Sequence, residues 1–278
     1  MIINDSKKVC FVHIPKCAGT SIRSLIQEFD DLNGAHTGRV EVHDELGLLD
    51  YVHIPLPVLS EHFPELYSKV KSYYSFAIIR DPYQRFASSI AQRLKKYGKK
   101  GLKDISNDEL IKEIDNCINF LNDHAEEKVL LPAEYIHFQR QSSYIYNEEK
   151  IVNDLFLIDD IDKCLSTLKD LFEIEVEKSS NKGIHENKSL VYRSKLFFRV
   201  NQCISAVIPK SILIKLVKLI KFCIPRAIIL KLKKVILVPK SSDINEIFNT
   251  ENVKTFIERY YKKDIELYNS LKRDARNL

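Results

Sequence analysis

The chain has 278 residues, of which 45% are hydrophobic and 29% are charged. This balance is typical of a folded globular protein and excludes a wholly disordered chain. The six cysteines are irregularly spaced and form no Cys-x-x-Cys pair, so we expect a reducing compartment and neither a zinc site nor thioredoxin-type chemistry.

The formal net charge of +5 is unevenly distributed. The segment from Lys195 to Lys240 contains eleven Lys or Arg and no acidic residue, which leaves 32 basic and 38 acidic residues for the rest of the chain. A surface for duplex nucleic acid would spread its basic residues differently, so we expect no nucleic-acid partner. We predict one domain over residues 1–278, in which residues 195–240 form a cationic amphipathic helical insert.

The first informative segment is a strand–loop–helix unit near the amino terminus. The apolar run from Lys8 to Ile14 predicts a buried strand, which residues 15–19 end. From Thr20 to Phe29 apolar residues recur at helical spacing, so a helix follows the loop directly. Because the apolar run is too short for a signal peptide or a membrane-spanning helix, we expect a cytoplasmic protein.

The loop of this unit has the residue types of a phosphate-binding loop. A helix amino terminus carries free N–H groups and partial positive charge, so it attracts phosphate. Lys16 adds a charge, Ala18 and Gly19 allow close approach to the backbone, and Thr20 and Ser21 add hydroxyl donors. In a Walker A loop the Lys follows the last Gly, whereas here it precedes Gly19. The alternative is a solvated Lys in an ordinary tight turn.

A second strand–helix unit follows at residues 74–94. Tyr74 to Ile79 predicts a strand, and Asp81 and Pro82 begin the next helix as a capping residue and a first-turn proline. Arg80 therefore stands at the carboxyl end of a strand, which is where ligands bind in open α/β sheets. The alternative is that Arg80 pairs with Asp81 or with a helix end.

The remaining elements follow from the same kind of pattern. Ser106 and Glu109 form a capping box ahead of a helix that runs to about Leu121. Two strands, each followed directly by a helix, predict an α/β fold with a P-loop-like central parallel sheet flanked by helices. Further elements are expected as short strands over residues 142–146 and 154–158 and as helices over residues 160–172 and 251–273.

Together, HIPKCAGTSI (residues 13–22) and FAIIRDPYQRFASS (residues 76–89) resemble the two nucleotide-binding motifs of sulfotransferases that use 3′-phosphoadenosine 5′-phosphosulfate (PAPS). The likeness is to the carbohydrate branch, which includes heparan 2-O-sulfotransferases and chondroitin or dermatan sulfotransferases. It spans about residues 9–194 and resumes in the last helix. It implies a carbohydrate O-sulfotransferase that takes PAPS as co-substrate and releases 3′-phosphoadenosine 5′-phosphate.

The resemblance assigns roles to individual residues. It implies that Lys16 and the following loop hold the 5′-phosphosulfate, and that Arg80 and Ser88 hold the 3′-phosphate. His137 and Gln141 lie in a segment similar to a His-and-Gln stretch of the family, near the substrate. Residues 185–193 resemble a later loop near the nucleotide. The implied donor-binding set is Lys16, Cys17, Ala18, Gly19, Thr20, Ser21, Arg80 and Ser88.

Sulfuryl transfer to a hydroxyl benefits from a general base. The family places a catalytic His shortly before the second strand, and His53 best matches that position, with Lys16 stabilising the departing bisphosphate. His36 also lies between the two motifs. His43, or a carboxylate such as Glu41 or Asp44, is the alternative base. The scheme requires no metal.

Residues 209–239 combine a basic face with a wide apolar face and contain Pro209, Pro225 and Pro239. The pattern is typical of helices lying in a membrane interface, so peripheral binding to the inner membrane face is one expectation. Packing on the domain core and contact with an anionic glycan are the alternatives. The acceptor is expected to be a surface polysaccharide or a lipid-linked glycan. A P-loop kinase and a non-catalytic, membrane-peripheral nucleotide-binding adaptor are the other functions that the sequence allows.

Overall fold

The computed structural model describes residues 1–98, 101–102, 104–125, 130–174, 190–192, 237–239 and 242–275. The chain divides into two compact units, Met1–Ile184 with Phe248–Leu278, and His185–Ile247. The second unit contains an antiparallel pair, β9 (Leu190–Tyr192) with β10 (Leu237–Pro239), and most of α11 (Ser242–Phe248). Apart from these strands, the cationic insert and the loop over residues 185–193 lie outside the described residues.

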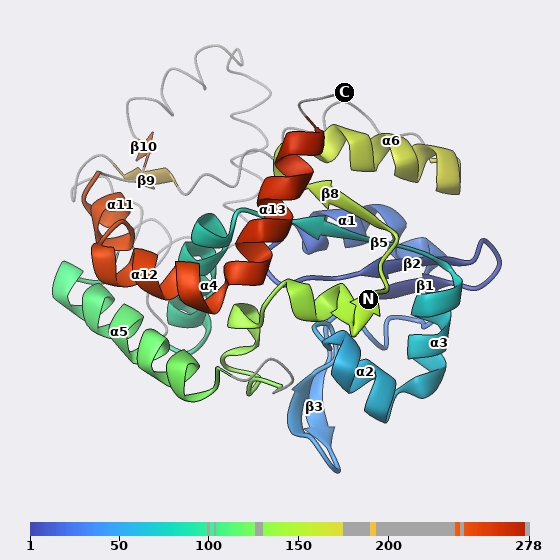
Figure 1. Cartoon of the computed structure of the whole chain (residues 1–278), viewed down its shortest axis with the longest axis horizontal. Helices are drawn as coiled ribbons and strands as arrows, with labels where there is room; N and C mark the ends of the chain where they lie inside the picture. Colours follow the sequence, from blue (N-terminus) through green and yellow to red (C-terminus); the bar gives the residue numbers. More distant parts are fainter. Residues whose placement is uncertain are drawn as a thin grey trace, which may run out of the picture. The chain divides into compact units, whose positions relative to one another are not determined.

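Four strands form the central sheet of the first unit, in the order β1 (Ile2–Asn4), β2 (Val9–Val12), β5 (Tyr74–Ile79) and β8 (Asp154–Leu157) (Figure 1). β2, β5 and β8 pair parallel to their neighbours, and β1 pairs antiparallel to β2. The side chains of β2 and β5 are almost all buried, as expected for parallel strands covered on both faces. The predicted α/β architecture with a parallel sheet is confirmed.

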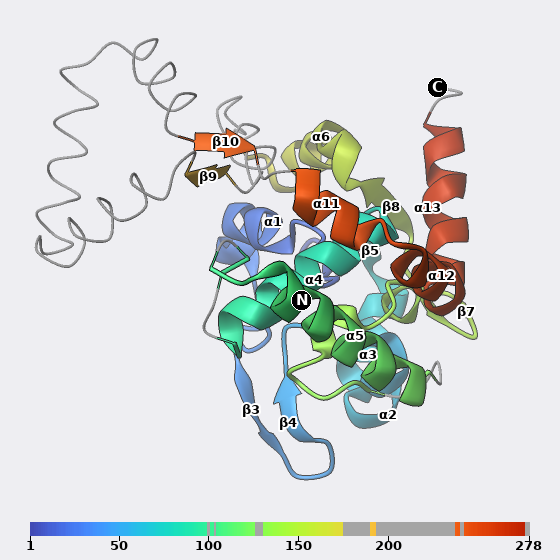
Figure 2. The same ribbon diagram turned by 90° about the vertical axis from the view of Figure 1, so that its left-hand side faces the viewer.

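Helices occupy the connections between the parallel strands and follow β8. They are α1 (Gly19–Ile26), η1 (Gln27–Phe29), α2 (Leu56–His62), α3 (Pro64–Ser72), α4 (Pro82–Lys96), α5 (Asn107–Asp123), η4 (Ile158–Asp160), α6 (Ile161–Phe172), α12 (Glu251–Tyr260) and α13 (Lys262–Asp274). α13 packs against β8 and α4, and α3 packs against β5 (Figures 1 and 2). Within the described residues, no helix combines the length and the apolar character needed to cross a membrane.

Capping residues begin α4 and α5 at the positions that the sequence predicts. The Asp81 carboxylate accepts a hydrogen bond from the backbone N–H of Gln84 and caps α4. The Ser106 hydroxyl and the Glu109 carboxylate form the reciprocal capping box of α5. These ends need only neighbouring residues, which explains why sequence periodicity and capping rules locate them.

Two expectations are wrong. Residues 142–146 are not a strand: η3 (Ser142–Tyr144) is a 3₁₀ turn, and only the small hairpin of β6 (Tyr146–Asn147) and β7 (Glu149–Lys150) follows. The expected last helix is two helices that meet at Tyr261. Tyr260 and Tyr261 are both buried, and their rings contact each other with 4.7 Å between the ring centroids. Neighbouring positions of a straight helix point about 100° apart, so a bend at this point buries both rings.

A further hairpin, β3 (Val40–His43) with β4 (Gly47–Asp50), has no counterpart among the expected elements. It extends away from the sheet in both views (Figures 1 and 2). Val42 and Leu48 form a cross-strand pair on it and are 75% and 56% exposed. β4 ends at Asp50, so the hairpin leads the chain directly to His53.

Candidate functional site

The loops that follow β2 and β5 meet at one edge of the sheet. Because these strands are parallel neighbours, both loops leave from the same edge. The guanidinium Nη1 of Arg80 donates a hydrogen bond to the backbone carbonyl of Lys16, with 3.2 Å between the two atoms. The structure therefore brings together the two segments that the sequence singled out.

The loop between β2 and α1 has an unusual backbone. Lys16 and Ala18 have positive φ angles of 65° and 58°, a conformation in which non-glycine residues are uncommon. No side chain caps the amino terminus of α1, and the Ser21 N–H donates to the carbonyl of Ala18. The N–H groups of Gly19 and Thr20, ahead of Ser21, can serve an anion. Thr20 is exposed at this end, and Ser21 is half-buried.

Packing inside the protein gives a second reason for a glycine at position 19, beside the close approach of a ligand that the sequence predicts. A Cβ atom at this position would overlap the imidazole ring of His13. The missing side chain therefore lets α1 begin directly against this ring, rather than only allowing a ligand to approach the backbone.

Among the described residues, the two cations of the site form no ion pair. Within the described part of the chain, neither Lys16 nor Arg80 forms an ion pair, and Asp81 caps α4 instead of pairing with Arg80. Burial lowers the pKa of Lys16, and the nearby charge of Arg80 lowers it further. Burial also lowers the pKa of Arg80, whose Nε atom is buried without a hydrogen-bond partner. An anion bound here would relieve both effects.

Helix α4 contributes the next side chains of the site. The Lys16 ammonium donates to the side-chain oxygen of Gln92 at 3.4 Å. Ser88 lies one turn before Gln92 on the same face of α4 and is half-buried. This spacing places Ser88 on the face of α4 that meets the loop. Gln92 was not expected from the sequence, because an amide in a helix has no distinguishing motif.

Three histidines, His13, His53 and His137, form a cluster next to the loop. The ring of His53 contacts the rings of His13 and His137, with centroid distances of 4.6 and 5.5 Å. Nδ1 of His53 lies 3.2 Å from the backbone carbonyl of His13. Since a carbonyl oxygen only accepts, Nδ1 carries the proton in the neutral ring, and Nε2 keeps its lone pair. In the neutral ring, Nε2 is therefore the nitrogen of His53 that can accept a proton.

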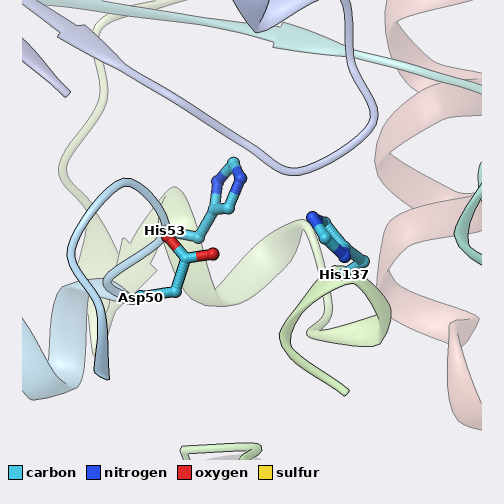
Figure 3. Close-up of side chains that lie close together, drawn as sticks. All are labelled: Asp50, His53 and His137. Atoms are coloured by element: carbon cyan, nitrogen blue, oxygen red, sulfur yellow. The ribbon is translucent and has the colours of Figure 1, made fainter. Parts of the chain in front are cut away.

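Asp50 completes this histidine cluster. Figure 3 shows one carboxylate oxygen of Asp50 directed to the space between His53 and His137. Ligating atoms of the three side chains lie within 4.8 Å of one another. These residue types bind zinc, although ligands at 2.0–2.1 Å from a tetrahedral zinc lie about 3.4 Å apart. As placed, the cluster has a looser spacing than that of a formed metal site.

Burial keeps the histidines of the cluster neutral. It lowers the pKa of His13 and His53 well below the ordinary 6.5, and that of His137 to about 3. Nearby positive charges act in the same direction, for His137 those of Lys16 and Lys96. Burial raises the pKa of Asp50. A neutral imidazole is the form that accepts a proton.

The alternative bases, and His36, the remaining histidine between the motifs, lie elsewhere. The ring of His43, on the hairpin, contacts His62 and Phe63. His36 is buried and its Nδ1 contacts the backbone carbonyl of Tyr51 at 3.0 Å. Glu41 and Asp44 are exposed on the hairpin and its turn. Of the histidines between the motifs, His53 is the one in contact with the residues that lead into the loop.

His137 and Gln141 both lie at this edge but in different surroundings. His137 joins the cluster, and its Nδ1 is buried without a hydrogen-bond partner. Gln141 is fully buried and contacts Cys17 and Arg80. Burial raises the pKa of the Cys17 thiol to about 12, so the thiol stays protonated and is a poor nucleophile.

Comparison with family models matches residues 1–270 to the family described as "Sulfotransferase family". No curated protein and no solved structure matches the chain. The family match covers nearly the whole chain, including both loops and the histidine cluster, and it makes the protein a transferase. The chain belongs to the sulfotransferase family.

Proposed function

We propose that the protein transfers the sulfuryl group of PAPS to a hydroxyl of a carbohydrate, either a surface polysaccharide or a lipid-linked glycan. The observation that carries the proposal is the contact between Arg80 and the loop at Lys16 at the carboxyl edge of a parallel sheet. It joins two cations that form no ion pair with any described residue. Sulfotransferases generally use PAPS, and the carbohydrate acceptor is supported by the resemblance of both motifs to that branch.

In this proposal, the donor is held from two sides. Lys16 and the backbone of residues 17–21 bind the 5′-phosphosulfate, where the uncapped end of α1 adds N–H donors. Arg80 binds the 3′-phosphate with its guanidinium, together with Ser88. Within the described residues, neither cation forms an ion pair. An anionic substrate would therefore complement their positive charge.

The reaction is an in-line displacement at sulfur. The acceptor oxygen attacks the sulfur atom while the bond between sulfur and the bridging phosphate oxygen breaks. The acceptor proton passes to Nε2 of His53, and the electron pair of the broken bond remains on the phosphate of 3′-phosphoadenosine 5′-phosphate. Lys16 stabilises the charge that develops on that oxygen. His13 holds the tautomer of His53 that this step needs.

A transfer assay with radiolabelled PAPS and glycan or glycolipid extracts tests the proposal. We expect labelled product from the wild-type protein and a loss of about 10²–10⁴-fold in kcat for His53→Ala. The same variant should bind 3′-phosphoadenosine 5′-phosphate as tightly as the wild type, measured by calorimetry. Lys16→Ala should lose both rate and nucleotide affinity, because Lys16 contacts the donor.

His43→Ala is the matched control, since it removes a histidine of the hairpin that lies outside the cluster. We expect near wild-type turnover for it. Wild-type turnover in His53→Ala would remove the base assignment. If the wild-type protein fails to bind the bisphosphate, or binds ATP with magnesium in its place, the proposal as a whole is wrong.

A further inference from the structure

The side-chain amide of Gln141 joins the two loops of the candidate donor site. Its Oε1 accepts hydrogen bonds from the backbone N–H of Arg80 at 3.0 Å and from the Cys17 thiol at 3.2 Å. Its Nε2 donates to the backbone carbonyl of Arg80 at 3.0 Å. One side chain thus contacts the loop after β2 and the residue after β5.

This bonding pattern depends on an amide. Gln141 pairs with both backbone groups of Arg80, as a neighbouring strand would, directly after β5 ends at Ile79. Only an amide offers an N–H donor and a carbonyl acceptor in one planar group, and a carboxylate lacks the donor. Gln141 has 0% of its surface exposed, so its function here is within the protein and not in direct contact with an acceptor.

The segment that carries Gln141 is itself fixed from the carboxyl-terminal region. The Asp264 carboxylate, fully buried on α13, accepts from the backbone N–H of Gln141 at 2.7 Å and of Ser142 at 2.9 Å. Arg85 of α4 donates to the backbone carbonyls of His137 and Gln139 and lies 3.8 Å from Asp264. The backbone from which the side chain of Gln141 extends is therefore held by α13 and α4.

We propose that Gln141 is a positioning residue of the donor site. Its amide sets the distance between the loop at Cys17 and the backbone of Arg80, and so places the charges of Lys16 and Arg80 for the two ends of a bisphosphate nucleotide. The charge of Arg80 lowers the pKa of Lys16, so the two cations disfavour each other's approach. The bonds of Gln141 to the Cys17 thiol and to the Arg80 backbone oppose this repulsion. This inference rests on the proposed donor, but the link itself is testable without it.

Gln141→Met tests the link, because Met has a similar volume and forms none of the three hydrogen bonds. We expect the dissociation constant for 3′-phosphoadenosine 5′-phosphate and the KM for PAPS to rise about 10- to 100-fold, since a misplacement of about 1 Å has effects of this size. Gln141→Glu keeps both acceptor bonds and loses the donor bond. Ser142→Ala is the matched control, because Ser142 meets Asp264 through its backbone N–H, which Ala retains.

Thiol labelling of the native protein with mass-spectrometric readout provides the measurement that needs no nucleotide. Cys17 is buried, as are Cys10, Cys117 and Cys164. If Gln141 holds the loop, Gln141→Met should raise the labelling rate of Cys17 at least 10-fold and leave the three reference cysteines unchanged. A merely structural role would expose all four together.

The outcomes separate the inference from the proposed function. Selective labelling of Cys17 in Gln141→Met, without nucleotide binding by the wild type, would support the link and reject the PAPS donor. Wild-type nucleotide affinity and wild-type Cys17 labelling in Gln141→Met would reject the positioning role while the donor assignment stands. An equal rise in the labelling rates of all four cysteines in Gln141→Met would also reject the positioning role.

Discussion

A single missing side chain decides how the phosphate-loop helix begins. Gly19 lies against the imidazole of His13, and a Cβ atom there would overlap this ring. We expect Gly19→Ala to lower the free energy of unfolding by about 1–3 kcal/mol, the usual cost of overpacking, and to weaken nucleotide binding. Thermal unfolding and calorimetry measure the two effects.

Gly38→Ala is the matched control for this substitution. Gly38 is exposed, and a Cβ atom there meets nothing within 4 Å. Its unfolding free energy should stay within about 0.5 kcal/mol of the wild type. Equal stability of the two variants would show that the His13 ring moves aside and that packing does not require Gly19.

The pH at which activity is lost on the acid side should report the pKa of the catalytic base. Burial holds the pKa of His53 well below 6.5, and the base must be unprotonated to act. Activity should therefore persist as the pH falls below 6.5 and be lost only as it approaches the lowered pKa. The measurement is kcat/KM for PAPS between pH 5 and 8. A loss of activity centred at 6.5 or above would contradict a buried His53 base.

At the scale of elements, α13 extends the site beyond the two motifs. Asp264 on this helix binds two backbone N–H groups of the segment that carries Gln141. Removing one member of a buried charged interaction typically lowers the free energy of unfolding by about 3–5 kcal/mol. We expect Asp264→Asn to lose stability in this range in urea unfolding. Glu266→Gln, an exposed position of the same helix, should unfold like the wild type.

The elements that sequence patterns locate are those with local causes. The strand at Tyr74–Ile79 and the capped start of α5 depend on neighbouring residues, and both occur as expected. The turn at Ser142–Tyr144 and the bend at Tyr261 depend on distant partners. Asp264 binds the first, and the burial of two adjacent rings produces the second. Residues far apart in sequence leave no periodic signal of their contact.

At the scale of the folded unit, the buried histidine cluster makes stability depend on pH. The pKa values of His13, His53 and His137 are lowered on folding, so the unfolded chain binds more protons below pH 6.5. The unfolding free energy should therefore be highest above pH 6.5 and fall as the pH drops, by about 1.4 kcal/mol per pH unit for each histidine.

Urea unfolding at several pH values between 5 and 7 measures this dependence. His137→Gln removes one of the three groups, so its stability should fall less steeply below pH 6.5, by about 1.4 kcal/mol per unit. The same slope in the variant and the wild type would mean that His137 is protonated in the folded protein.

The sequence alone determined the parallel α/β fold and singled out the two loops, with Lys16 and Arg80, as a candidate site. Strand and helix periodicity and loop chemistry are local properties, which is why the sequence shows them. It also indicated His53 through a family resemblance. Only the tertiary structure decided that His13, Asp50 and His137 surround His53, and that Gln141 joins the loops. Hydrogen bonds and ring contacts between distant segments form only once the sheet, α4 and α13 have packed, and no spacing in the chain specifies them.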